Sequence, residues 1–178
     1  MSERIEFRLS GSGGQGVITA GIILAEAALN EGLNAIQSQS YGPEARGGAS
    51  KAEVIISKES IDYPKATTPN YLLCLTQESF NLYAKTSDPS TQVFVDDSVD
   101  TSGFDRAVIA APILETAQTE LKPLVANVVA LGFLVGYTGI VSRDGAKEAV
   151  LDRVPKGTEE LNTKAVSAGY ALADKAKA

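Results

Sequence analysis

Polar and apolar residues alternate along residues 4–9, which is the pattern of a strand with one buried face. The stretch over residues 14–31 is apolar except for one narrow polar stripe, which predicts a helix covered on most sides. Further strands are predicted at residues 33–41, 49–57, 70–76, 91–96 and 107–111. Helices are predicted at residues 77–85, 113–119, 123–138, 143–152 and 158–176.

Strands that alternate with helices predict a Rossmann-like, three-layer α/β/α sandwich with a mostly parallel central sheet and a helical C-terminal third. No helix is predicted between the strands at residues 33–41 and 49–57, so we expect one antiparallel step and a mixed sheet. The length of 178 residues favours one domain over residues 1–178.

The amino-acid composition excludes several kinds of catalytic and metal-binding site. The chain has no histidine and one cysteine, so it cannot by itself form a His-based zinc site, a catalytic triad or an iron–sulfur cluster. We therefore predict no metal site, and because no motif nominates a catalytic acid or base, we predict no catalytic residue. Cys74 stands in an apolar run and is predicted to be a buried small side chain. The net charge of −6, without a basic cluster, argues against a nucleic-acid partner.

The location of the chain is predicted from its hydropathy. The first residues run directly into a strand, so we expect no signal peptide and a cytoplasmic location. Residues 124–141 are nearly all apolar, but they include Asn127 and glycines, and their length is at the short limit for a bilayer crossing. We therefore expect a buried helix there and no membrane partner.

A glycine segment, residues 10–16, separates the first strand from the first helix. Gly11, Gly13 and Gly16 have the spacing of a dinucleotide fingerprint. The acidic residue that would hold a ribose is missing from residues 37–41, which argues against NAD(P). Gln15 stands where a nucleotide-triphosphate loop has lysine, which argues against ATP or GTP. A turn without ligand, another phosphate-bearing ligand and a protein contact remain open.

A second loop, residues 42–48, follows the second strand. Two interpretations of this loop remain open. Arg46 and Glu44 form only a surface ion pair, or Arg46 binds a phosphate or carboxylate, in which case Gly47 and Gly48 would allow close approach. If the first two strands are parallel neighbours, Arg46 and residues 13–16 converge on one anion. Asn127, inside an apolar helix, is either a buried amide bonded to nearby backbone or a polar contact at an interface or ligand edge.

These motifs occur together in one known family. In order and spacing, residues 11–16, the run from Tyr41 to Ser50 and residues 127–132 resemble the gamma subunit of 2-oxoacid:ferredoxin oxidoreductases over nearly the whole chain. The Tyr-Gly-Pro-Glu and Arg-Gly-Gly elements of the second loop are most similar to the 2-oxoglutarate type.

The resemblance implies an enzyme divided among several chains. Such a complex decarboxylates a 2-oxoacid on thiamine diphosphate, passes electrons through iron–sulfur clusters to ferredoxin, and forms an acyl-CoA. The implied partners are alpha and beta subunits that bind thiamine diphosphate and a ferredoxin-like subunit that carries clusters. We expect this chain to be inactive alone, and to form homodimers or larger species when isolated.

The resemblance also implies roles for residues. A CoA site shared with the partners would include Gly11, Gly13, Gly14, Gln15, Gly16 and Arg46. Interface or structural roles would fall to Tyr41, Glu44, Gly47, Gly48 and Asn127. The alternatives are a stand-alone nucleotide-binding oxidoreductase domain and a purely structural assembly subunit.

Overall fold

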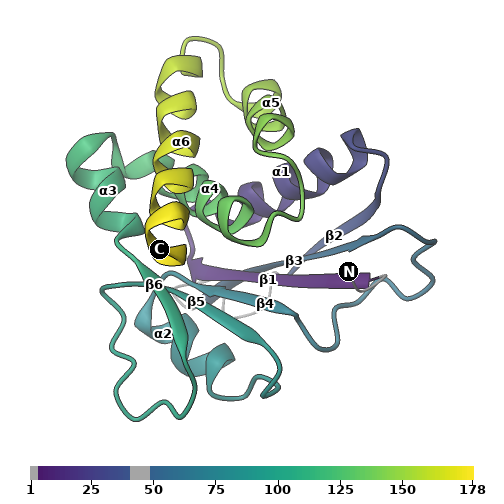
Figure 1. Ribbon diagram of the computed structural model, residues 1–178, viewed down its shortest axis with the longest axis vertical. Coiled ribbons are helices and arrows are strands. Elements are labelled where there is room, and N and C mark those ends of the chain that lie inside the picture. The colour runs from purple at the N-terminus through teal and green to yellow at the C-terminus, as the bar shows by residue number, and fades with distance from the viewer. Residues whose placement is uncertain (1–3, 41–48) are drawn as a thin grey trace.

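A mixed sheet forms the centre of the computed structural model, which describes residues 4–40 and 49–178 (Figure 1). In this part of the chain six strands lie in the order β2-β3-β1-β4-β5-β6. Their bounds are β1 (Arg4–Ser12), β2 (Asn34–Ser40), β3 (Ala49–Ser57), β4 (Tyr71–Cys74), β5 (Gln92–Asp96) and β6 (Val108–Ala111). The strands β1, β4, β5 and β6 are parallel, whereas β3 is antiparallel to both β1 and β2. The predicted mixed sheet is confirmed.

The helices form one thick layer and one thin layer. The thick layer contains α1 (Val17–Asn30), α3 (Ile113–Glu120), α4 (Ala126–Thr138), α5 (Arg143–Arg153) and α6 (Glu159–Lys177) (Figure 1). The opposite face carries the short α2 (Gln77–Ser79) and the π-helical turn η2 (Phe80–Ala84), which has its own core around Phe80, Leu72 and Val93. The predicted three-layer sandwich with a helical C-terminal third is confirmed.

The helix α4 explains the membrane-like hydropathy of its region. Val129, Leu131 and Phe133 are fully buried, because α1, α3, α5 and α6 surround α4 within the thick layer. Gly132 and Gly169 allow α4 and α6 to cross closely, since a Cβ at Gly132 would lie 2.4 Å from the carbonyl oxygen of Val166. Among the described residues, no helix is long and apolar enough to cross a membrane.

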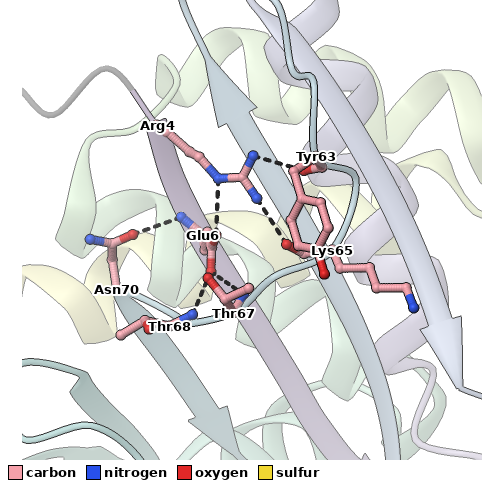
Figure 2. A network of polar contacts seen from close by, with 7 residues as sticks. All are labelled: Arg4, Glu6, Tyr63, Lys65, Thr67, Thr68 and Asn70. Atoms are coloured by element: carbon pink, nitrogen blue, oxygen red, sulfur yellow. Dashed lines mark hydrogen bonds and ion pairs between the residues drawn. The ribbon is translucent and has the colours of Figure 1, made fainter.

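A polar network fixes the long connection between β3 and β4 to the amino end of β1 (Figure 2). Glu6 is 5% exposed, and its carboxylate accepts hydrogen bonds from the backbone N–H groups of Thr67 and Thr68 at 2.8 and 2.9 Å. Arg4 pairs with Glu6 at 2.9 Å and also donates to the carbonyl oxygens of Tyr63 and Lys65. A buried carboxylate requires such partners, and here they order an otherwise irregular segment.

The glycine segment differs from its predicted form. The first strand does not end at residue 9 but continues to Ser12, because Gly11 and Ser12 pair with β3. The first helix begins at Val17 rather than at residue 14. Gly14 and Gly16 have φ angles of 107° and 75°, in the left-handed region that glycine adopts without strain, so the helix cannot include them.

Candidate functional site

The glycine segment lies at the carboxyl edge of the parallel strands. From β1 the chain passes through α1 to β2 on one side, whereas β4 pairs with β1 on the other side. The order of the sheet therefore reverses at β1. In open α/β sheets this switch point, at the carboxyl ends of the strands, is where ligands bind.

Backbone donors at this edge lack partners within the described chain. The N-terminus of α1 has no side-chain cap and no acidic residue in its first turn. No hydrogen bond to another described group engages the N–H groups of Gly13, Gly14 or Gly16. Unpaired N–H groups and the helix dipole together favour a negatively charged group at this position.

Gln15 holds the glycine segment in shape. Its carboxamide oxygen accepts a hydrogen bond from the N–H of Ser12 at 2.8 Å, and its own N–H donates to the Ser12 carbonyl oxygen at 3.2 Å. The side chain lies across Gly11, where a Cβ would come within 2.4 Å of that carboxamide oxygen. The oxygen is thus used inside the segment, while the NH₂ group forms no hydrogen bond among the described residues.

Asn127 braces the segment from α4. Its Nδ2 donates to the carbonyl oxygen of Gly16 at 3.3 Å, and a Cβ at Gly16 would lie 2.6 Å from that nitrogen. Asn127 also borders a hollow of about 180 Å³ between α1, α4 and the connection from α5 to α6. The structure therefore places Asn127 against the glycine segment, and its two sequence-based interpretations both remain compatible with this position.

Two hollows border the glycine segment, and Gly14 lines both of them. The serine hollow, about 380 Å³, has Ser12, Ser40 and Ser50 as its polar side chains and also contacts Gly13 and Gly16. The glutamine hollow, about 320 Å³, is lined by Gly14, Gln15, Leu114, Gln118, Pro123, Leu124 and Ala126. A Cβ at Gly14 would meet no atom within 4 Å, so this glycine leaves open space between the two hollows.

Several predicted site residues lie outside the described part of the chain. These are Tyr41, Glu44, Arg46, Gly47 and Gly48. We expected Arg46 to converge with the glycine segment if the first two strands were parallel neighbours. Strands β1 and β2 are not neighbours, because β3 lies between them. Their carboxyl ends still share one edge, since Ser40 of β2 and Ser10 of β1 both pair with Lys51 of β3.

The position of β3 between β1 and β2 also bears on whether this site could bind a dinucleotide. In a dinucleotide-binding fold the ribose is held at the end of the strand next to the glycine strand. Here that neighbouring position is occupied by an antiparallel strand, whose residue at this edge is Ala49, paired with Ser12. Among the described residues, this position therefore supplies neither the acid nor the strand end that a ribose needs.

Acidic groups lie further along the same edge. Asp96, at the end of β5, accepts a hydrogen bond from the N–H of Leu114 at 2.8 Å and so caps α3. Burial, together with the charges of Asp96 and Glu115, raises the pKa of Asp97 above its usual value. An anion is thus disfavoured beside β5 and favoured beside the glycine segment.

Cys74 is inert, as the sequence predicted. It is fully buried, and burial raises the pKa of its thiol to about 12, so it stays protonated at neutral pH. In the described residues no group of three or more His, Cys, Asp or Glu side chains is arranged to hold a metal ion.

Sequence reasoning missed Ser40, Ser50, Gln118 and Leu124. Pairing register brings Ser50 opposite Gly11, and the fold brings Gln118 of α3 to the glycine segment. No spacing along the sequence indicates either contact. Leu124 is 71% exposed, which is unusual for a large apolar side chain, but its neighbours in sequence indicate a buried helix.

Comparison with known proteins defines the class. The family model described as "Pyruvate ferredoxin/flavodoxin oxidoreductase" matches residues 6–172. The chain therefore belongs to this family, and it is a gamma-type subunit of a 2-oxoacid:ferredoxin oxidoreductase, as the motifs predicted.

Individual relatives indicate which type of 2-oxoacid:ferredoxin oxidoreductase the chain resembles. The chain is 49% identical to "2-oxoglutarate synthase subunit KorC" of Methanocaldococcus jannaschii, over 96% of this chain and 94% of that protein. It is 30% identical to "Pyruvate synthase subunit PorC" of the same organism, over 93% of this chain and 95% of that protein. The chain is thus most like the 2-oxoglutarate type.

Solved structures agree with this. The gamma subunit of a keto/oxoacid ferredoxin oxidoreductase from Geobacter sulfurreducens matches with a TM-score of 0.87 and 45% identity, over 97% of this chain and 98% of that chain. A 2-oxoglutarate:ferredoxin oxidoreductase from Magnetococcus marinus, solved with 2-oxoglutarate, coenzyme A and succinyl-CoA bound, matches with a TM-score of 0.87 and 25% identity, over 98% of this chain but 32% of that chain.

Proposed function

We propose that this chain is the gamma subunit of a 2-oxoglutarate:ferredoxin oxidoreductase, in which the glycine segment binds CoA beside the thiamine-binding subunits. The observation that carries the proposal is the cluster of backbone N–H groups of Gly13, Gly14 and Gly16 at the uncapped start of α1, which bond to no other group in residues 4–40 and 49–178. Support comes from the KorC relative and from the coenzyme A in the structure of the Magnetococcus marinus enzyme.

The donors present fit a CoA phosphate. Backbone N–H groups at a helix N-terminus bind phosphate oxygens without a bound metal, and the serine hollow adds hydroxyl donors. No Lys or Arg lines either hollow among the described residues. The proposal therefore assigns the attraction to oriented dipoles, with Arg46 as the candidate cation.

In this proposal the cofactors are divided among the subunits. Iron–sulfur clusters would be held by partner subunits, because this chain has one cysteine and it is buried. Thiamine diphosphate would also be held by partner subunits, as the family resemblance implies. Forming an acyl-CoA then requires the thiol to reach an acyl group on another chain. The glycine segment must accordingly face the thiamine-binding subunits.

Reconstitution tests the proposal. We expect ferredoxin reduction by 2-oxoglutarate and CoA from the complete complex, and none from the isolated chain or from a complex that lacks it. Gly14→Ala and Gln15→Ala should raise the KM for CoA and leave the KM for 2-oxoglutarate unchanged.

Other outcomes would select a different function. If both variants impaired assembly but not the KM for CoA, the segment would be an interface and the chain a structural subunit. Micromolar binding of NADH by the isolated chain, without binding of CoA, would favour a stand-alone nucleotide-binding oxidoreductase.

A further inference from the structure

The hollows on either side of Gly14 differ in chemistry. The serine hollow offers hydroxyl groups and the N–H groups of Gly13 and Gly16, which are unpaired within the described part of the chain. The glutamine hollow offers the carboxamides of Gln15 and Gln118 against apolar walls from Leu114 and Leu124. A ligand lying across Gly14 therefore meets an anion-binding surface on one side and a neutral amide-binding surface on the other.

The two carboxamides are available to a ligand. The oxygen of Gln15 is engaged by Ser12, which leaves its NH₂ group as a donor. Gln118 is exposed on α3 and makes no side-chain hydrogen bond within the described residues, so it offers both a donor and an acceptor. A neighbouring pair of this kind matches a chain of secondary amides, whose C=O and N–H groups need one donor and one acceptor each.

The apolar walls match the same class of ligand. Leu124 is 71% exposed and lies beside the carboxamides, where methylene groups of a ligand would cover it. Neither hollow has a charged side chain among its described lining residues, but Gly13 and Gly16, whose N–H groups bond to no other described group, line only the serine hollow. A phosphate would therefore find fewer hydrogen-bond donors in the glutamine hollow, whereas an aliphatic amide chain needs only the carboxamides and the apolar walls.

We infer that the site is directional: phosphate groups occupy the serine hollow, and an aliphatic chain of secondary amides runs across Gly14 into the glutamine hollow, between Gln15 and Gln118. This inference rests on the proposed function, and it assigns the pantetheine arm of CoA to the α3 side. The thiol end would then leave the chain past Leu124, which places the acyl-bearing partner on that side.

Calorimetric titration of the assembled complex, without 2-oxoacid, tests the direction. The ligands are CoA, pantetheine as the amide arm alone, and adenosine 3′,5′-bisphosphate as the phosphate-bearing end alone. Gln118→Ala should weaken CoA and pantetheine about fivefold, the effect of one hydrogen bond of roughly 1 kcal/mol, and leave the bisphosphate unchanged. Ser40→Ala should show the reverse selectivity.

The control is Gln92→Ala, an exposed glutamine at the amino end of β5, which should change none of the affinities. Weakening of the bisphosphate by Gln118→Ala, or affinities that Gln118→Ala leaves unaltered, would overturn the inferred direction. If the wild-type complex bound CoA no better than a complex without this chain, the proposed function itself would fail, which is a distinguishable result.

Discussion

Gly16 combines an unusual backbone with a close neighbour. Its φ of 75° is left-handed, and a Cβ there would lie 2.6 Å from Nδ2 of Asn127. Gly16→Ala should therefore lower the free energy of unfolding by more than the about 1–2 kcal/mol that a left-handed alanine costs. Urea denaturation measures this loss.

Gly32 supplies the matched control for that prediction. Its φ is 82°, yet a Cβ there would meet nothing within 4 Å, so Gly32→Ala should show the backbone effect alone. Asn127→Ala in the Gly16→Ala background should remove the difference between the two glycines. Equal losses at both glycines would mean that Asn127 does not brace the segment.

Spacing in the sequence singled out Gly11 and Gln15 as candidates for a ligand site, but it did not indicate how they contact each other. In the structure a Cβ at Gly11 would meet the carboxamide oxygen of Gln15, and Gln15 turns inward because Ser12 offers an N–H group. Both facts depend on a turn whose left-handed residues no hydrophobic pattern encodes.

The elements at the amino edge of the sheet depend on Glu6. Its carboxylate accepts from two backbone N–H groups and pairs with Arg4 (Figure 2). Glu6→Gln should lower the free energy of unfolding by about 1.5–3 kcal/mol, the usual value of hydrogen bonds to a charged group. Hydrogen exchange at Thr67 and Thr68 should accelerate.

The distance between Glu6 and the glycine segment allows the effect of Glu6→Gln on stability to be distinguished from an effect on CoA binding. Glu6 lies about 20 Å along β1 from Ser12, at roughly 3.3 Å per residue, so Glu6→Gln should leave the affinity for CoA unchanged. Glu59→Gln, in an exposed part of the same connection, is the control and should alter neither exchange nor stability. Unchanged exchange at Thr67 in Glu6→Gln would contradict the role given to the network.

The contact between α5 and α6 should respond to alkaline pH. Tyr170 donates its hydroxyl to the carbonyl oxygen of Arg143 at 2.6 Å, and burial raises its pKa from 10.0 to about 12. Because the folded chain holds this proton more tightly than the unfolded chain, the stabilisation is complete below pH 10 and is lost as the pH approaches 12.

Comparison with Tyr170→Phe isolates this titration from the other tyrosines. The difference in unfolding free energy between wild type and variant should shrink between pH 10 and 12, and the ultraviolet phenolate signal of Tyr170 should appear only near the upper end. A phenolate signal near pH 10 would show that Tyr170 is exposed.

Among the elements, every predicted strand and helix is present, and the errors lie at the ends. The predicted helix over residues 77–85 is divided into α2 and η2, and the predicted helix over residues 123–138 begins with a 3₁₀ turn at Pro123–Val125. Periodicity reports which face is buried, but it does not distinguish α-helix from the tighter or wider turns that the packing selects.

At the scale of the whole molecule, the sequence predicted a mixed sheet but not the order of its strands. Strand β3 enters the sheet between β1 and β2, because two antiparallel pairings of nine and seven residues are available to it. This strand order distinguishes the fold from dinucleotide-binding folds, but the carboxyl ends of β1 and β2 still lie at one edge of the sheet. Composition had excluded an iron–sulfur cluster held by this chain alone, and the resemblance to the gamma subunits implied that partners hold the cofactors.

The relatives place the same fold in two settings. The Geobacter sulfurreducens gamma subunit is matched over nearly its whole length, whereas only a third of the Magnetococcus marinus chain is matched. The fold therefore occurs both as a separate chain and within a longer one.

Calorimetry of CoA binding to the assembled complex, with Gln15→Glu in this chain, shows whether the glycine segment binds CoA. Glutamate retains an oxygen that accepts from Ser12, so the segment keeps its shape, but it loses the NH₂ donor and adds a negative charge beside the unpaired N–H groups. We predict normal assembly and CoA binding at least about tenfold weaker, equivalent to roughly 1.4 kcal/mol. Unchanged CoA affinity in a correctly assembled complex would contradict the account.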